Sequence, residues 1–160
     1  MTLRPATGAD LPALAAIRAR PEVARWWGVV ADAAEVADEI EDPDTEVYAV
    51  LAEGRLVGAI QWYAEPDPDF RHAGMDLYLD PEVHNQGLGT DAVRTLARHL
   101  ITAHGHHRLI IDPAAANTAA IRAYTKVGFR PVGVMRRNWR DPDGVWQDCL
   151  LLDLLAEELT

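Results

Sequence analysis

A short glycine-containing segment in the middle of the chain constrains the fold most. It reads His84-Asn85-Gln86-Gly87-Leu88-Gly89-Thr90. The stretch from Met75 to Asp80 before it alternates apolar and polar residues, which predicts a strand. The stretch after it repeats apolar residues at the spacing of a helix that packs on a sheet, namely Val93, Leu96, Ala97, Leu100 and Ile101. We therefore expect a strand, a glycine loop and a helix in direct succession.

This succession is typical of an anion-binding loop. Gly87 and Gly89 have no side chain, so the main chain there can approach a ligand closely. The first turn of the following helix has N–H groups without an intrahelical partner, and the positive end of the helix dipole adds to their attraction for an anion. The loop therefore predicts a site for a phosphorylated cofactor.

The loop by itself is compatible with three kinds of site. Gly87, Gly89 and Ala92 fit the dinucleotide fingerprint, and Asp112 lies about where its ribose-binding acid is expected. In that fingerprint, however, a strand runs straight into the first glycine, whereas here Pro81 to Gln86 intervene. The loop is also similar to the coenzyme A pyrophosphate loop of GNAT acetyltransferases, which usually reads Arg/Gln-x-x-Gly-x-Gly/Ala. A purely structural turn is the third interpretation.

Composition narrows the class of protein. The chain has 160 residues, the size of one ordinary domain. It contains no apolar run long enough for a transmembrane helix, and its first residues lack the apolar region of a signal peptide. Cys149 is the single cysteine, which excludes an internal disulfide and a four-cysteine zinc site and favours a buried structural thiol. We expect a cytoplasmic protein with no membrane partner.

The charge balance bears on the partners of the chain, because the formal net charge is −10. Proteins that bind nucleic acids use Lys and Arg to contact phosphates, so this balance argues against a nucleic-acid partner. An acidic surface steers cationic substrates inward, but it also simply aids solubility. The positions of the carboxylates decide between these two interpretations.

The other segments predict a mixed α+β fold in one domain, residues 1–160. We expect strands at 2–6, 47–52, 56–63, 109–111, 132–139 and 145–153, and helices at 11–17, 21–28, 33–41 and from Asn117 onward. Asp10 is the expected N-cap of the first helix. The order predicts antiparallel strands, two parallel crossovers and a final hairpin around Asp141-Pro142-Asp143-Gly144.

Two further segments resemble one family. Pro21-Glu22-Val23-Ala24-Arg25-Trp26-Trp27-Gly28 looks like the early Trp-Trp-Gly segment of aminoglycoside 6′-N-acetyltransferases. Asp112-Pro113, Asn117 and Tyr124-Thr125-Lys126-Val127-Gly128-Phe129 resemble the later motif of the same family. The resemblance covers most of the chain, from Trp26 to Leu154. It implies the GNAT fold, a central and mostly antiparallel sheet with a parallel, splayed strand pair and helices on both faces.

The resemblance also implies acetyl-CoA as the cofactor. The residues that it places at the cofactor are Leu77, Tyr78, Leu79, Gln86, Gly87, Leu88, Gly89, Thr90, Asn117 and Lys126. Backbone N–H groups around Leu77 to Leu79 would polarise the thioester carbonyl. The chain departs from the family at His84, where Arg or Gln is usual, and at Asn85, where Gly is common. Phosphate binding by the side chain at position 84 is therefore not implied.

Two residues are candidate catalytic groups by the same resemblance. Asp76 corresponds to the acid that contacts the substrate amine, and a carboxylate whose pKa is raised by burial can accept the amine proton directly or through water. Tyr124 corresponds to the general acid, or thiol-orienting group, that serves the leaving coenzyme A thiolate. A solvated strand carboxylate and a core aromatic are the alternative roles of these two residues.

The candidate substrate-binding residues are aromatic or acidic, and they are Trp26, Trp27, Asp76, Asp112 and Asp148. We expect one of the two tryptophans to line a sugar site and the other to pack in the core. Asp112 either binds a substrate amine or stabilises a turn before Pro113. Asp148 either contacts the substrate or pairs with Arg136 or Arg137 across the final hairpin.

No metal is expected, although three histidines lie close together in the sequence. His104, His106 and His107 follow a helix end, where a cationic His is favourable. Nearby carboxylates or cysteines that would complete a ligand set in fixed register are missing from the sequence.

We expect an N-acetyltransferase that acetylates the 6′-amine of an aminoglycoside by direct attack in a ternary complex. The partner is then a small cationic amine, and the chain is a monomer or a homodimer. Three interpretations compete with this one. The acceptor is a lysine-type amine or a protein N-terminus, the chain is a binding-only relative without turnover, or, more distantly, it is a dinucleotide oxidoreductase.

Overall fold

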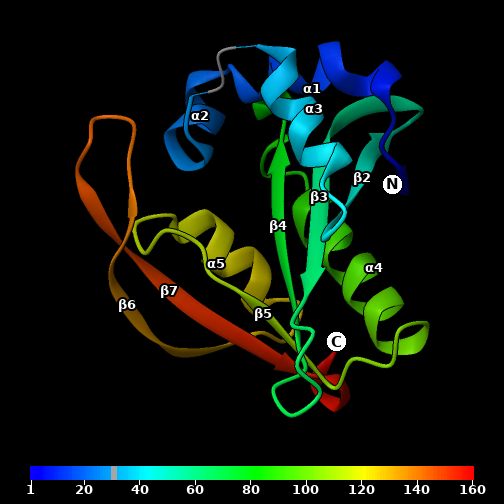
Figure 1. The fold of residues 1–160 in the computed structure, drawn as a ribbon, viewed down its shortest axis with the longest axis vertical. Helices are drawn as coiled ribbons and strands as arrows, with labels where there is room; N and C mark the ends of the chain where they lie inside the picture. The colour runs from blue at the N-terminus through cyan, green and yellow to red at the C-terminus, as the bar shows by residue number, and fades with distance from the viewer. Residues whose placement is uncertain (30–31) are drawn as a thin grey trace.

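One mixed sheet of seven strands runs through the molecule in the order β1-β2-β3-β4-β5-β7-β6 (Figure 1). The structure is a computed structural model, and it describes residues 1–29 and 32–160. The strands are β1 (Thr2–Pro5), β2 (Thr45–Ala52), β3 (Arg55–Ala64), β4 (Ala73–Leu79), β5 (Arg108–Ile111), β6 (Arg130–Arg140) and β7 (Trp146–Leu155). All the strands expected from the sequence are present, with ends that differ by a few residues.

The helices lie on both faces of this sheet. They are α1 (Leu11–Arg18), α2 (Pro21–Trp27), α3 (Ala33–Glu41), α4 (Leu88–Thr102) and α5 (Thr118–Thr125), with three short 3-10 helices at 8–10, 81–83 and 156–158. None of the helices in the described part of the chain is long and apolar enough to cross a membrane.

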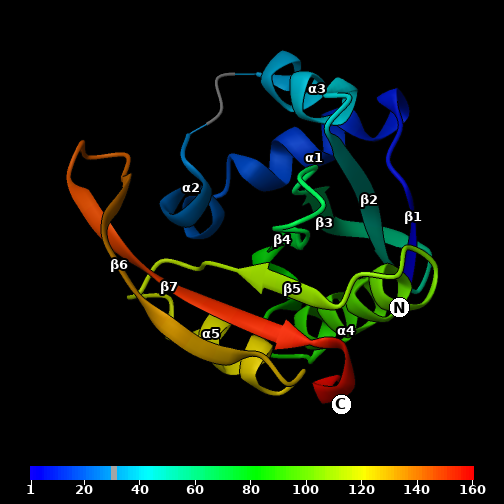
Figure 2. The same cartoon turned by 60° about the horizontal axis from the view of Figure 1, so that its bottom comes forward.

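Two apolar clusters attach these helices to the sheet. Residues of α4 such as Leu96 and Leu100 pack on the sheet together with Phe129, which follows α5. On the other face, Leu14 of α1 and Val36 of α3 pack against Ala59 and Tyr78. Figure 2 shows the sheet between these two groups of helices. The mixed α+β fold with helices on both faces is therefore confirmed.

The strands β4 and β5 form the parallel pair, and they separate after two residues. Ala73 pairs with Leu109 and Gly74 with Ile110, and β4 then continues beside β3 alone as far as Leu79. The predicted splay is thus confirmed, and it opens at Met75. Because β4 is longer than its pairing with β5, its last residues have one backbone edge free of a neighbouring strand.

The last strand enters the sheet between two earlier ones. β7 is antiparallel to both β5 and β6, so β5 and β6 run parallel to each other without being neighbours. Of the two parallel crossovers expected, the first therefore joins paired strands and the second spans β7. The hairpin turn at Asp141 to Gly144 is as predicted, with the Gly144 N–H donating to the Asp141 carbonyl at 2.9 Å.

Asp10 is the N-cap residue of α1, as predicted, but its side chain is engaged elsewhere. Its buried carboxylate accepts hydrogen bonds from Arg4 at 2.7 and 2.8 Å and from the Thr7 N–H at 2.8 Å, and it makes no cap bond to α1. These bonds, from the Arg4 guanidinium above all, lower the pKa of Asp10 to about 2. From the N-cap position the carboxylate thus joins β1 to the start of α1.

Candidate active site

The glycine loop between β4 and α4 has the geometry of an anion site. Gly87 is the N-cap of α4 with φ +82°, a left-handed conformation that glycine adopts without strain. The Asp91 N–H donates to the Gly87 carbonyl at 3.0 Å. The N–H groups of Leu88, Gly89 and Thr90 come before this first helical bond, so they are available to a ligand. A group of phosphates fits these donors.

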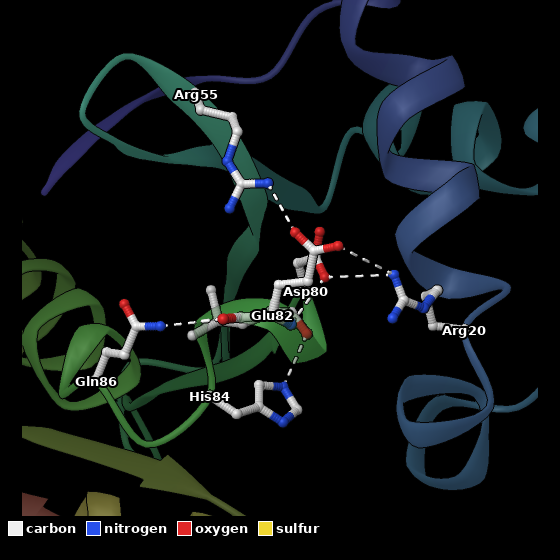
Figure 3. Close-up of polar contacts among 7 residues, drawn as sticks. Arg20, Arg55, Asp80, Glu82, His84 and Gln86 are labelled. Atoms are coloured by element: carbon white, nitrogen blue, oxygen red, sulfur yellow. Dashed lines mark hydrogen bonds and ion pairs between the residues drawn. The ribbon is translucent and has the colours of Figure 1, made fainter.

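The segment between β4 and the glycine loop is tied to other parts of the fold (Figure 3). Arg20 lies 3.7 Å from an Asp80 oxygen and 3.9 Å from a Glu82 oxygen, and Arg55 reaches Glu82 at 3.2 Å. The Gln86 side chain donates to the Glu82 carbonyl at 3.0 Å. These contacts hold the loop in place from two sides, because Arg20 follows α1 and Arg55 begins β3.

A cavity of about 480 Å³ extends from the glycine loop to the splayed part of β4. Nine of the ten predicted cofactor residues line it, together with Tyr124 and other residues of α2 and α5; the nine are Leu77, Tyr78, Leu79, Gly87, Leu88, Gly89, Thr90, Asn117 and Lys126. The carboxamide oxygen of Asn117 also caps α5 by accepting the Ala120 N–H at 3.2 Å. Gln86 is not among the lining residues.

Basic side chains accompany the free N–H groups at this cavity. Arg25, Arg122 and Lys126 all line it, although the chain as a whole is acidic. Lys126 was predicted, and the two arginines were not. Positive side chains beside free backbone donors are the combination that binds a pyrophosphate or another phosphate group, so the residues present fit coenzyme A.

A second cavity of about 310 Å³ adjoins the first and contains the predicted catalytic and substrate residues. Five residues line both cavities, and they are Trp26, Trp27, Leu77, Asn117 and Tyr124. Asp76 and Asp112 line the second cavity alone. An acetyl donor in the first cavity and an amine in the second would therefore meet beside Tyr124.

The two carboxylates of the second cavity lie in positions that raise their pKa values. Burial, with the negative charge of Asp112 next in size, raises the pKa of Asp76 to about 6. The Gln61 amide opposes this effect by donating to Asp76 at 3.4 Å. Burial also raises the pKa of Asp112. A carboxylate with a pKa near 6 is a base suited to neutral pH, and neither residue has an ion pair in the described part of the chain.

Tyr124 is buried at the point where the two cavities meet, with 6% of its surface exposed. Burial raises the pKa of its phenol, and the charges of Asp76 and Asp112 raise it further. The phenol therefore stays protonated over the whole physiological range, as a hydrogen-bond donor must. Its ring also lies 6.4 Å from that of Phe129, measured between centroids, in a tilted arrangement, so it has the packing of a core aromatic as well.

Both tryptophans of the early segment line the cavities, and this differs from the expected division into one wall and one core residue. Trp26 stacks under the Arg25 guanidinium at 4.4 Å. Trp27 packs edge-on against Tyr78 with the ring centroids 4.9 Å apart, and its indole N–H donates to the Leu77 carbonyl at 3.1 Å. Trp27 is thus both a wall and a core residue.

Asp148 does not line either cavity, so the structure does not bring it together with the other predicted substrate residues. Its carboxylate accepts the Arg137 N–H across the hairpin at 2.8 Å. The register of β6 shifts between Met135 and Trp139, and Arg137 has φ +50° within this bulge. The carboxylate therefore bonds a backbone donor that the bulge removes from the ladder, so the expected contact with Arg137 across the hairpin is present but is made through the backbone N–H.

The same bulge brings in residues that the sequence analysis missed. Asn138 and Trp139 line the second cavity, as does Cys149 on β7. The indole nitrogen of Trp139 is buried and has no hydrogen-bond partner in the described part of the chain. The alternation in 132–139 contains no signal for a bulge, so these positions could not be found from it. Burial raises the pKa of the Cys149 thiol, which agrees with the predicted structural role.

The histidines near the end of α4 pack on an aromatic residue. The rings of His104 and His106 lie 4.8 and 5.7 Å from that of Trp62, measured between centroids. In the described ranges, no group of three or more His, Cys, Asp or Glu side chains is arranged to hold a metal ion.

Comparison with known proteins identifies the family to which these cavities belong. Residues 1–130 match the family model described as the acetyltransferase (GNAT) domain. The aminoglycoside N(6′)-acetyltransferase type 1 of Klebsiella pneumoniae is 29% identical over 164 residues, which cover 90% of this chain and 79% of that protein.

Solved structures agree with this match. The aminoglycoside acetyltransferase AAC(6′)-Ib in complex with coenzyme A has a TM-score of 0.81 and 26% identity, over 98% of this chain and 95% of that one. The spermidine N-acetyltransferase of Vibrio cholerae, in complex with coenzyme A and spermine, has a TM-score of 0.85 over 98% of this chain and 96% of that one, and at 19% identity it shows the fold alone. Because the family model matches most of the chain, this protein belongs to the GNAT family of acetyltransferases and uses acetyl-CoA as its acetyl donor.

Proposed function

We propose that this enzyme acetylates the 6′-amine of aminoglycosides. The observation that carries the proposal is the presence of two carboxylates with raised pKa values, Asp76 and Asp112, in the cavity next to the cofactor cavity. A polycation has several ammonium groups, so one carboxylate can bind one of them while the other serves the reacting amine. Because these two acidic residues lie at the proposed substrate site, we interpret the negative net charge as a means of steering a cationic substrate and not only as an aid to solubility.

Asp76 is the proposed proton acceptor. The substrate arrives as an ammonium ion and must lose one proton before its nitrogen can attack. With a pKa of about 6, the Asp76 carboxylate is ionised at neutral pH and can take this proton directly or through water. Asp76 directly precedes Leu77 in the sequence, so the proposed base lies next to the backbone N–H that would face the acetyl group.

Bound acetyl-CoA supplies the acetyl group as a thioester. The Leu77 N–H donates to the carbonyl oxygen on which negative charge develops, and this stabilises the transition state. The carbon–sulfur bond would break as the amine nitrogen bonds to the carbonyl carbon. Tyr124, which lines both cavities, would give its hydroxyl proton to the departing sulfur, and the second proton that the nitrogen loses on becoming an amide would return to Tyr124. Leu77 and Tyr124 line both cavities, and Asp76 is the sequence neighbour of Leu77.

Trp139 favours an aminoglycoside over a simple polyamine. A polyamine offers only ammonium groups, and these cannot accept a hydrogen bond from an indole N–H. An aminoglycoside has hydroxyl and ring oxygens that can. The buried Trp139 nitrogen without a protein partner, in a cavity that also contains carboxylates, therefore suits a substrate with amines and hydroxyls together.

Release of free thiol from acetyl-CoA tests the proposal. The acceptors are a matched pair of aminoglycosides, one with an amine and one with a hydroxyl at the 6′ position, together with spermidine, lysine and a peptide with a free N-terminus. We expect turnover with the 6′-amine compound and none with its 6′-hydroxyl partner. Faster turnover of spermidine or the peptide would refute the substrate class, and coenzyme A binding without thiol release from any amine would identify a binding-only relative.

Two cellular consequences belong to the same proposal. The enzyme acts in the cytoplasm, where acetyl-CoA is available, and acetylation removes a positive charge from the antibiotic. Expression in a susceptible bacterium is therefore expected to raise the inhibitory concentration of the 6′-amine aminoglycoside and to leave that of the 6′-hydroxyl compound unchanged.

A further inference from the structure

The free edge of β4 is a row of backbone groups that faces the cofactor cavity. The Asp80 N–H donates to the Val57 carbonyl at 2.7 Å, so even-numbered residues of β4 direct their backbone groups toward β3. In an antiparallel pair, the intervening residues point the other way. The N–H and carbonyl groups of Leu77 and Leu79 therefore face the side that β5 has left, and those of Tyr78 do not.

Both outward carbonyls of this edge already accept a hydrogen bond from a side chain. The Trp27 indole N–H donates to the Leu77 carbonyl at 3.1 Å. The His84 Nε2–H donates to the Leu79 carbonyl at 3.0 Å, a contact drawn in Figure 3. The two donors come from different segments, α2 and the turn before the glycine loop. The N–H groups of Leu77 and Leu79 have no such side-chain partner in the described part of the chain.

Trp27 is held firmly in this position. The Arg18 guanidinium lies 4.9 Å from the Trp27 ring centroid and 5.3 Å from that of Tyr78. Only 3% of Arg18 is exposed, and its guanidinium donates to both oxygens of Glu39 at 2.8 and 2.9 Å. A ring packed against both a buried cation and Tyr78 has little room to turn, and this packing directs its N–H toward the strand.

We propose that Trp27 and His84 are positioning residues that turn the free edge of β4 into a row of donors. A bare carbonyl beside the thioester would repel its oxygen and would bind water. With the Leu77 carbonyl occupied by Trp27, the Leu77 N–H is the group of that residue that remains for the thioester oxygen. His84 acts in the same way one step nearer the glycine loop, where the rest of the cofactor lies. This role also accounts for His84 in place of the usual Arg or Gln.

The two residues act at different places along the cofactor, which separates their kinetic effects. Leu77 lines both cavities and lies beside the reacting atoms, whereas Leu79 lines the cofactor cavity alone. In Trp27→Phe we expect kcat to fall about tenfold, with KM for acetyl-CoA changed less than about twofold. In His84→Leu we expect KM for acetyl-CoA to rise about fivefold with kcat nearly unchanged.

Two further variants test whether the N–H group itself is responsible. His84→Gln keeps a side-chain donor and is expected to restore most of the affinity for acetyl-CoA lost in His84→Leu. A benzothienyl analogue of the indole, introduced at position 27, keeps the ring shape and lacks the N–H. It is expected to reproduce the loss in kcat even if Trp27→Phe folds poorly. Trp146→Phe, on the exposed hairpin, is the control for loss of an indole.

The kinetics use whichever amine gives the fastest thiol release, so the inference depends on acetyl-CoA as donor and not on the acceptor. Absence of aminoglycoside turnover would overturn the proposed function alone. A benzothienyl variant with wild-type kcat would overturn the role of Trp27. Calorimetry measures the affinity of each protein for coenzyme A and for acetyl-CoA. If His84→Leu binds both ligands as tightly as the wild type does, the proposed role of His84 is overturned.

Discussion

Asp76 and Asp112 line one cavity from two strands that pair for only two residues and then separate. Asp76 lies on the longer strand beyond the last pair, and Asp112 follows directly after the shorter one. Because the strands diverge, the space between them is open to a ligand and both carboxylates face it. The charge of Asp112 is also one cause of the raised pKa of Asp76. The split in the sheet thus creates the cavity proposed for the substrate and contributes to the raised pKa of Asp76, the proposed proton acceptor.

The pH dependence of turnover is expected to report the ionisation of Asp76. Since the base must be ionised, kcat/KM for the acceptor rises with pH through about 6 and levels off above it, where the pKa of Asp76 lies. Asp76→Asn is expected to lower kcat about 100-fold and to remove this acidic limb. Initial rates of thiol release between pH 5 and 8.5 provide the measurement. A limb that persists in Asp76→Asn would exclude Asp76 as its source.

Asp112 is expected to influence the same profile at a distance. Removing its negative charge in Asp112→Asn lowers the pKa of Asp76, so the acidic limb moves to lower pH. The loss of one ammonium contact also raises KM for a polycationic acceptor, by about tenfold. Acceptor saturation curves at several pH values test both effects. An unchanged midpoint would mean that the two carboxylates do not interact.

Asp76 is expected to lower the stability of the free enzyme at neutral pH. Its folded pKa of about 6 exceeds the ordinary value of 3.8, so the native state binds more protons than the unfolded state in this range. Stability therefore falls as pH rises from about 4 through 6, by about 1–3 kcal/mol once the partial exposure of the carboxylate is considered. Asp76→Asn should raise the melting temperature at pH 8 and have little effect at pH 4. The same gain at both values would rule out this origin.

Tyr124→Phe is expected to lower kcat about 10- to 100-fold and to change KM for acetyl-CoA little. The phenol donates to sulfur only as the thiolate leaves, so the loss falls on the chemical step. The Phe ring keeps the packing against Phe129. Acetyl donors with leaving thiols of lower pKa should regain part of the lost rate, because they need less help from an acid. Equal losses for all thiols would contradict the proposed role.

The left-handed conformation of Gly87 is expected to matter for cofactor binding. An added Cβ would meet no atom within 4 Å, but φ is +82°, so Gly87→Ala strains the loop by about 1 kcal/mol. We expect KM for acetyl-CoA to rise several-fold. Gly54→Ala is a matched control, since Gly54 has φ +80° and equal space in the turn between β2 and β3. A rise in KM for both variants would point to general destabilisation.

Local patterns in the sequence were enough to predict the helices and strands and to predict acetyl-CoA as the acetyl donor. The alternation from Met75 to Asp80, the glycines at 87 and 89 and the helical spacing after them predict strand, loop and helix because each pattern repeats within a few residues. The Asp-Pro segment and the helix around Tyr124 added the family and its cofactor. The strand, the loop and the helix could be predicted because each is formed by the same neighbouring residues that make up its sequence pattern.

Tertiary structure alone decided which predicted residues share a site. The position of Asp76 beyond the last β4–β5 pair depends on strand pairing between distant segments, and the bulge in β6 both withdraws Asp148 and brings in Trp139. The direction of the His84 side chain, toward the Leu79 carbonyl instead of a phosphate, depends on how the loop lies against β4. Register and side-chain direction arise from contacts far apart in the chain, and so no local pattern in this sequence contains them.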